Sequence, residues 1–174
     1  MEQYIGGDIE KILGEEFLTW LWFKSETNNL FTTENKEFSL FTERKIVVEY
    51  GEGQSAELAS SSGPASELKE ARLGLSNGKK VVRATYRMEC EEENYLVTLR
   101  ASDFSLNGFR TPKIDTSDIN EEESDAYFLE KFFLLEQGIE FIDTLYSQYI
   151  HIRCSNEWNK EKDAISSWII ESLN

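Results

Sequence analysis

Five basic side chains in and beside one predicted β-hairpin are the residues best placed for chemistry. They are Lys79, Lys80, Arg83, Arg87 and Arg100. Lys79, Arg83 and Arg87 are four residues apart on one face of a strand, so each lies roughly 13 Å from the next. Such a row can follow a nucleic-acid backbone through its phosphates without reading bases. The sequence therefore predicts a phosphate-binding face, and the alternative is that these cations pair with acids on neighbouring elements.

The local charge around this row is opposite to that of the chain. Between Lys69 and Arg87 the sequence has six Lys or Arg residues and one acid, Glu70. The 174 residues together have 18 Lys or Arg and 33 Asp or Glu, which gives a net charge of −15. A surface this acidic repels phosphate backbones and anionic lipid. Nucleic-acid binding would therefore depend on the basic row.

Other candidate chemistry is weak. The segment 74–80, GLSNGKK, resembles a phosphate-binding loop, but it has three residues between its glycines and no Ser or Thr after the lysine. It is expected to end a helix and turn into a strand. Cys90, Cys154 and His151 make neither a zinc site nor a nucleophile–base pair, and both cysteines are expected to be free thiols. We expect no enzymatic activity, no metal and no cofactor.

Residues 79–102 predict the antiparallel hairpin that carries the basic row. Alternation turns these apolar side chains toward the core: Val82, Ala84, Tyr86, Met88, Cys90, Tyr95, Val97, Leu99 and Ala101. Residues 91–94 are expected to form a four-residue turn. That turn places Arg87 opposite Thr98 and Thr85 opposite Arg100.

The remaining patterns predict an α+β fold in one domain, residues 1–174. Helical spacing covers 8–27, a helix follows Pro64, and strand alternation covers 37–60. An acidic linker is expected over 115–125. Apolar residues then recur at alternating spacings of four and three: Phe128, Phe132, Leu135, Ile139, Ile142, Tyr146 and Tyr149. We expect an antiparallel sheet of four or five strands packed against helices, with a long C-terminal helix over 124–152 and a helical hairpin completed from Trp158 onward.

The helix predicted over 8–27 is apolar nearly all round. Its aromatic residues Phe17, Trp20, Trp22 and Phe23 form a wide stripe. Such a helix is usually buried on more than one side. Two interpretations stay open: a central core helix, in which Trp20 is buried, or a partner interface formed by these four aromatics.

The N-terminus lacks the pattern of a signal peptide, and the longest apolar stretch is too short to span a bilayer. We expect a cytoplasmic protein with no membrane partner, which would be nucleoid-associated if it binds DNA.

Four blocks of sequence resemble the C-terminal half of RdgC-type recombination-associated proteins, most closely the RdgC-like chains of delta-proteobacteria. The blocks are GEEFLTWLWFKSE, SELKEARLGLSNGKKVVRA, RASDFSLNGFRTPK and FLEKFFLLEQGIEFIDTLYSQYI. The resemblance implies an α+β chain that assembles as a ring-shaped dimer, encircles duplex DNA without sequence preference and limits access of the RecA recombinase. The family's N-terminal half has no counterpart in this sequence.

Two functions follow as hypotheses. The first is a non-enzymatic DNA-associated protein of the RdgC type, which binds duplex DNA weakly through its backbone and modulates recombination. The second is a protein–protein interaction module that docks through its aromatic N-terminal helix and long C-terminal helix. Its partner would be a separately encoded RdgC-like N-terminal protein or a second copy of the chain.

Overall fold

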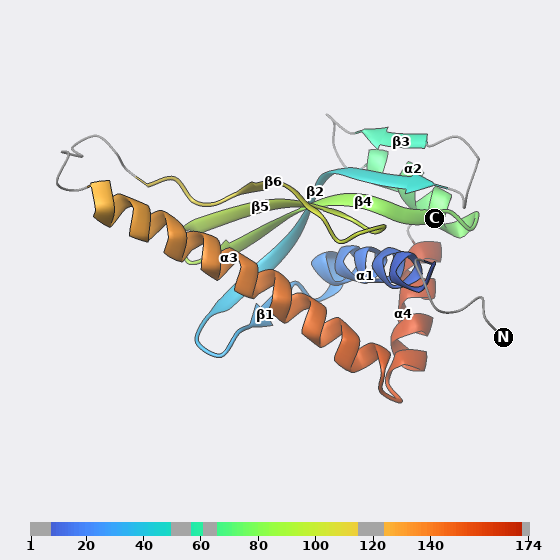
Figure 1. The fold of residues 1–174 in the computed structure, drawn as a ribbon. Coiled ribbons are helices and arrows are strands. Elements are labelled where there is room, and N and C mark those ends of the chain that lie inside the picture. Colours follow the sequence, from blue (N-terminus) through green and yellow to red (C-terminus); the bar gives the residue numbers. More distant parts are fainter. Residues whose placement is uncertain (1–7, 50–56, 61–65, 115–123, 172–174) are drawn as a thin grey trace.

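The computed structural model describes residues 8–49, 57–60, 66–114 and 124–171, which form one α+β unit (Figure 1). The helices are α1 (Asp8–Thr27), α2 (Ser66–Ser76), α3 (Ser124–Arg153) and α4 (Trp158–Glu171). The strands are β1 (Leu30–Thr32), β2 (Glu37–Glu49), β3 (Glu57–Ser60), β4 (Lys80–Cys90), β5 (Glu93–Arg100) and β6 (Leu106–Arg110). The predicted fold class is confirmed. The acidic linker predicted over 115–125 lies almost wholly outside the described residues.

All strand pairs in the described sheet are antiparallel, in the order β1-β2-β4-β5-β6, with β3 pairing to β2. The sheet has six strands where four or five were expected. The additional ones are the short strands β1 and β6, whose residues lack clear alternation. In β2, the pairing moves from Thr42 with Tyr86 to Ile46 with Ala84, so β2 has two extra residues there. Extra residues bend a strand, and β2 changes direction across the sheet (Figure 1).

The core lies between one face of the sheet and helices α1 and α3 (Figure 1). Trp20 is completely buried, and its ring packs against Phe17, Phe31 and Tyr149. This confirms the prediction that Trp20 belongs to the core. Helix α1 lies close to the sheet because Gly14 has no side chain, since a Cβ there would collide with the carbonyl oxygen of Ala101.

Helix α4 packs against α1 and also contacts α3, where Trp158 meets Tyr149. The Trp168 ring packs edge-on against Trp22 and Phe23 of α1. Between α2 and α4, the Arg72 guanidinium lies 4.6 Å from the Trp168 ring centroid and forms an ion pair with Glu26. Burial lowers the pKa of Arg72.

The β4–β5 hairpin is tighter than predicted. Cys90 pairs with Glu93, so the turn contains two residues and not four, and Glu91 adopts a φ of 55°. The register therefore differs by two residues from the expected one, and Thr85 pairs with Thr98. A shift of two keeps every side chain on its predicted face. Its main consequence is that Arg83 lies directly opposite Arg100.

Candidate functional site

A bulge in β4 divides the predicted basic row. Val47 of β2 pairs with Arg83, but Val48 pairs with Val81, so Val82 is an extra residue. One extra residue reverses the alternation beyond it. Val81 is therefore completely buried, where Val82 had been predicted to face the core.

The same reversal removes Lys79 from the row. Its side chain is 5% exposed, and it lines a different cavity, together with Thr19, Leu75 and Trp158. The turn before it fits the predicted helix end: Gly78 has a φ of 88°, and the Lys79 amide donates to the Gly74 carbonyl over 3.0 Å. The prediction that Lys79 lies beside Arg83 and Arg87 is therefore wrong.

Arg87 is on the expected face, but acids already neutralise it. Its Nε donates to Glu43 Oε1 over 2.7 Å, and another of its nitrogens forms an ion pair with Glu89. Its guanidinium also lies 4.7 Å from the centroid of the Phe41 ring. For this residue the alternative interpretation, a cation held by neighbouring acids, fits the structure.

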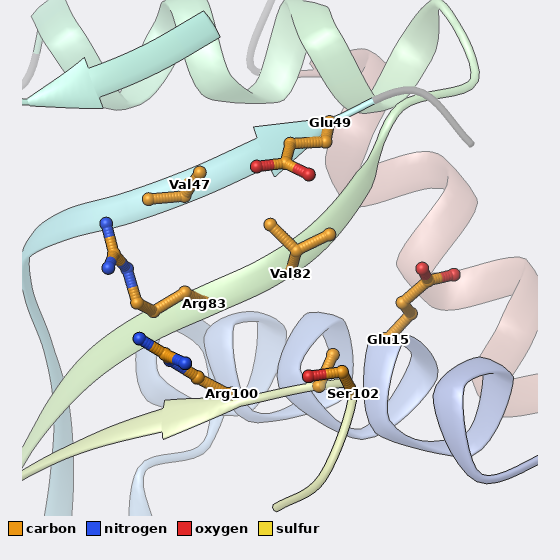
Figure 2. A pocket seen from close by; sticks show the side chains of 8 residues that line it. Glu15, Val47, Glu49, Val82, Arg83, Arg100 and Ser102 are labelled. Carbon is orange, nitrogen blue, oxygen red and sulfur yellow. The ribbon is translucent and has the colours of Figure 1, made fainter. Parts of the chain in front are cut away.

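Arg83 and Arg100 remain as a pair on the sheet face opposite the core. Both line one open pocket of about 360 Å³, whose other lining residues are Glu15, Val47, Glu49, Val82, Ala101 and Ser102. Figure 2 shows the two guanidinium groups at one end of the pocket, with Glu15 and Glu49 placed away from them. Within the described residues, neither arginine has an ion-pair partner. Like charges directly opposite each other destabilise a sheet.

The surroundings of the pair include charges of both signs. Asp103 follows closely in the chain, and its pKa is lowered mainly by hydrogen bonds from the Ser105 side chain and amide, with a smaller contribution from the charge of Arg100. Lys80 is exposed at the start of β4 and pairs in register with Glu49. Lys80 lines the other cavity, together with Lys79. The site is thus a pair of arginines with Asp103 close to Arg100, not a continuous basic row of five.

The four aromatics predicted as a partner interface are not on the surface. Phe17, Trp20, Trp22 and Phe23 are all buried by the chain's own sheet and helices. The sheet and Tyr149 cover one side of α1, and Trp168 covers the other. No partner can reach these side chains while the fold is intact, so this interpretation is corrected.

Among the described residues, most of the exposed large apolar side chains lie instead on the N-terminal half of α3. Six large side chains there are at least 39% exposed: Phe128, Leu129, Phe132, Phe133, Leu135 and Ile139. This half of α3 extends past α1 and lies along β5 and β6 (Figure 1). Phe109 of β6 and Lys131 of α3 join Phe128, Phe132 and Leu135 around an open apolar groove of about 340 Å³. We call the six exposed residues of α3, from Phe128 to Ile139, the α3 face.

Other site types find no support in the described part of the chain. There, no group of three or more His, Cys, Asp or Glu side chains could hold a metal ion. Cys90 is buried and Cys154 exposed, both as free thiols. None of the described helices is long and apolar enough to cross a membrane.

Comparison with known proteins adds no relative. No family model matches the chain, and neither a curated protein nor a solved structure matches it. The resemblance to RdgC-type proteins and the DNA binding that it implies therefore stay predictions.

The arginines make the DNA-binding prediction testable. If the chain binds duplex DNA through this face, Arg83→Ala should reduce the slope of log affinity against log salt by about one. Arg87→Ala should change the slope much less, because Glu43 and Glu89 already neutralise that residue. Fluorescence anisotropy with a labelled duplex at several salt concentrations measures both slopes. Equal slopes for the wild type and both variants would remove this face as a DNA site.

Proposed function

We propose that this chain is a protein–protein interaction module that docks through the α3 face. One observation carries the proposal: six large apolar side chains, each at least 39% exposed, gather on one half of one helix. Water-exposed apolar groups on this scale mark interaction sites on soluble domains. The sequence predicted docking through two helices. The proposal retains the long helix, α3, as the docking element and drops the N-terminal helix, α1.

The spacing of the α3 face favours a helix as the docking element. Phe128, Phe132, Leu135 and Ile139 follow at intervals of four, three and four residues, as do the seam positions of a coiled coil. A 3.5-residue repeat drifts slowly around a straight helix. The stripe accordingly starts exposed at Phe128 and ends buried at Tyr149, where the chain's own α1 covers it. Its N-terminal part is left for a partner.

Charges beside this seam favour a second copy of the chain as the partner. Lys131 and Glu136 flank the seam, are exposed and lie five residues apart. In a parallel two-helix coiled coil, flanking residues five apart face each other across the two helices. Two copies would therefore form two Lys131–Glu136 pairs around a two-fold axis. These pairs act against the repulsion between two chains of charge −15.

Charge reversal tests this arrangement. Lys131→Glu replaces both attractive pairs with repulsive ones, and Glu136→Lys does the same with the opposite sign. Each exposed pair contributes about 0.2–1 kcal/mol, so each variant should self-associate about tenfold more weakly. An equimolar mixture of the two variants should associate again, because every pair then joins opposite charges. Sedimentation velocity measures all three samples.

Lys160→Glu is the matched control, because it makes the same charge change at an exposed position on α4. It should leave self-association within about twofold of wild type. If Lys160→Glu weakens association as much as Lys131→Glu, net charge explains the effect. If the mixture associates no better than its components, the parallel pairing is wrong.

A further inference from the structure

The arginine pair has no structural role that the described residues reveal. Arg83 and Arg100 are cross-strand partners of the same charge, and neither forms an ion pair within the described residues, although Arg100 and the nearby Asp103 attract each other. Arginine stays protonated at every physiological pH, so the pair cannot relieve the repulsion by losing a proton. A bound anion between the two groups would relieve it.

The pocket has the shape and walls of a small-ligand site. Its volume of about 360 Å³ lies in the range typical of small-molecule sites. Val47 and Val82 form apolar walls beside the guanidinium groups, and Ser102 adds a hydroxyl (Figure 2). Apolar walls lower the local dielectric constant and so strengthen a charge-assisted hydrogen bond.

The charges of the pocket favour a phosphate group at the arginine end. Two guanidinium forks present planar N–H donors that match the oxygens of a phosphate or carboxylate. A phosphomonoester has a charge of about −1.5 to −2 at pH 7, close to the opposite of the pair. A single phosphodiester has less charge, and a nucleic acid meets the repulsion of the whole acidic surface.

The two carboxylates of the pocket indicate which chemical groups the rest of that ligand carries. Glu15 and Glu49 line the pocket away from the guanidinium groups (Figure 2). Carboxylates accept hydrogen bonds, so they fit hydroxyl or amino groups and repel a second anionic group. We propose that this pocket binds a small phosphomonoester, with its phosphate between Arg83 and Arg100 and its hydroxyl-bearing or amino-bearing part toward Glu15 and Glu49.

Calorimetric titration of the full chain tests the proposal with three probes: ribose 5-phosphate, inorganic phosphate and ribose. Ribose 5-phosphate should bind more tightly than phosphate alone, and ribose should not bind measurably. Arg83→Ala and Arg100→Ala should each weaken ribose 5-phosphate binding about tenfold or more. The control Arg110→Ala removes the same charge from the same open face, opposite Leu96, and should change the affinity less than about twofold.

A thermal melt of each variant provides a second readout. Because Arg83→Ala and Arg100→Ala each remove the like-charge contact between the two arginines, these two variants without ligand should melt at or above the wild-type temperature. Ribose 5-phosphate should raise the melting temperature of the wild type and of Arg110→Ala only.

Three results would overturn the proposal. One is a wild type that binds neither phosphate probe. Another is a loss of affinity in Arg110→Ala as large as in the two pocket variants, since the anion would then sense only the general field. The third is binding of a short DNA duplex in preference to ribose 5-phosphate with equal losses in all three variants, because the face would then be a diffuse nucleic-acid surface.

Discussion

Replacing Trp20 with alanine should lower the free energy of unfolding by about 3–5 kcal/mol. The ring is completely buried and packs against Phe17, Phe31 and Tyr149, so its removal leaves a cavity at the centre of the core. The substitution also removes the Trp20 Nε1 donor of a 2.8 Å hydrogen bond to Glu161. That bond connects α4 to α1, so we expect its loss to weaken the packing of α4 as well as the core. Urea denaturation followed by circular dichroism measures the loss.

Trp20→Phe separates the two contributions. It retains most of the ring volume and removes the N–H donor, while Lys24 still pairs with Glu161. We expect a cost of about 1–2 kcal/mol, the range for a partly compensated hydrogen bond to a charged group. If Trp20→Ala costs no more than Trp20→Phe, the ring is not a central part of the core.

Replacing Phe132 with aspartate should weaken self-association by at least about 100-fold. Phe132 is 54% exposed and sits in the middle of the α3 face. In an assembled pair its ring would be buried, and an aspartate there would place two unpaired charges in an apolar seam. The isolated chain should stay folded, because the substituted side chain is largely in water. Sedimentation equilibrium measures the change.

Ile170→Asp is the control for the change from an apolar to a charged residue. Ile170 is 60% exposed and lies on α4, away from the α3 face. It should leave self-association within about twofold of wild type. An equal loss in both variants would show that added charge, and not the α3 face, determines association.

The two proposed sites are on opposite faces of the sheet and can be tested independently. Helix α3 packs on the core face, where Tyr95 and Phe109 lie next to Gly138. Arg83 and Arg100 project from the other face. Substitutions in the arginine pocket should therefore leave self-association unchanged, and Phe132→Asp should leave phosphate binding unchanged.

Periodicity in the sequence predicted the helices, most strands and much of the core, because burial of one face of a strand or helix makes apolar residues recur at regular spacing. Trp20, Tyr86 and Val97 are buried as their positions indicated. The pattern could not place Lys79, since a single extra residue at Val82 reverses which side chains face inward. The bulge could not be recognised from the sequence, because Val81 and the extra residue Val82 are both valines, and either could face the core.

The registers depend on backbone details that composition does not record. The acidic segment after Cys90 allowed a turn of four residues, but a left-handed residue at Glu91 closes it with two. The opposition of Arg83 and Arg100 follows from that difference alone. For α3, the apolar stripe was visible in the sequence. The exposure of that stripe could not be predicted, because it depends on α3 extending past α1, which covers only its C-terminal half.

The mass of the wild-type chain at sedimentation equilibrium, measured over a wide range of protein concentration, tests the central claim most directly. Docking through the α3 face predicts a reversible rise from 20.2 kDa toward twice that mass as concentration increases. Phe132→Asp should remain at the single-chain mass over the same range. A wild-type chain that keeps the mass of one copy at every concentration would contradict the claim that α3 binds a second copy.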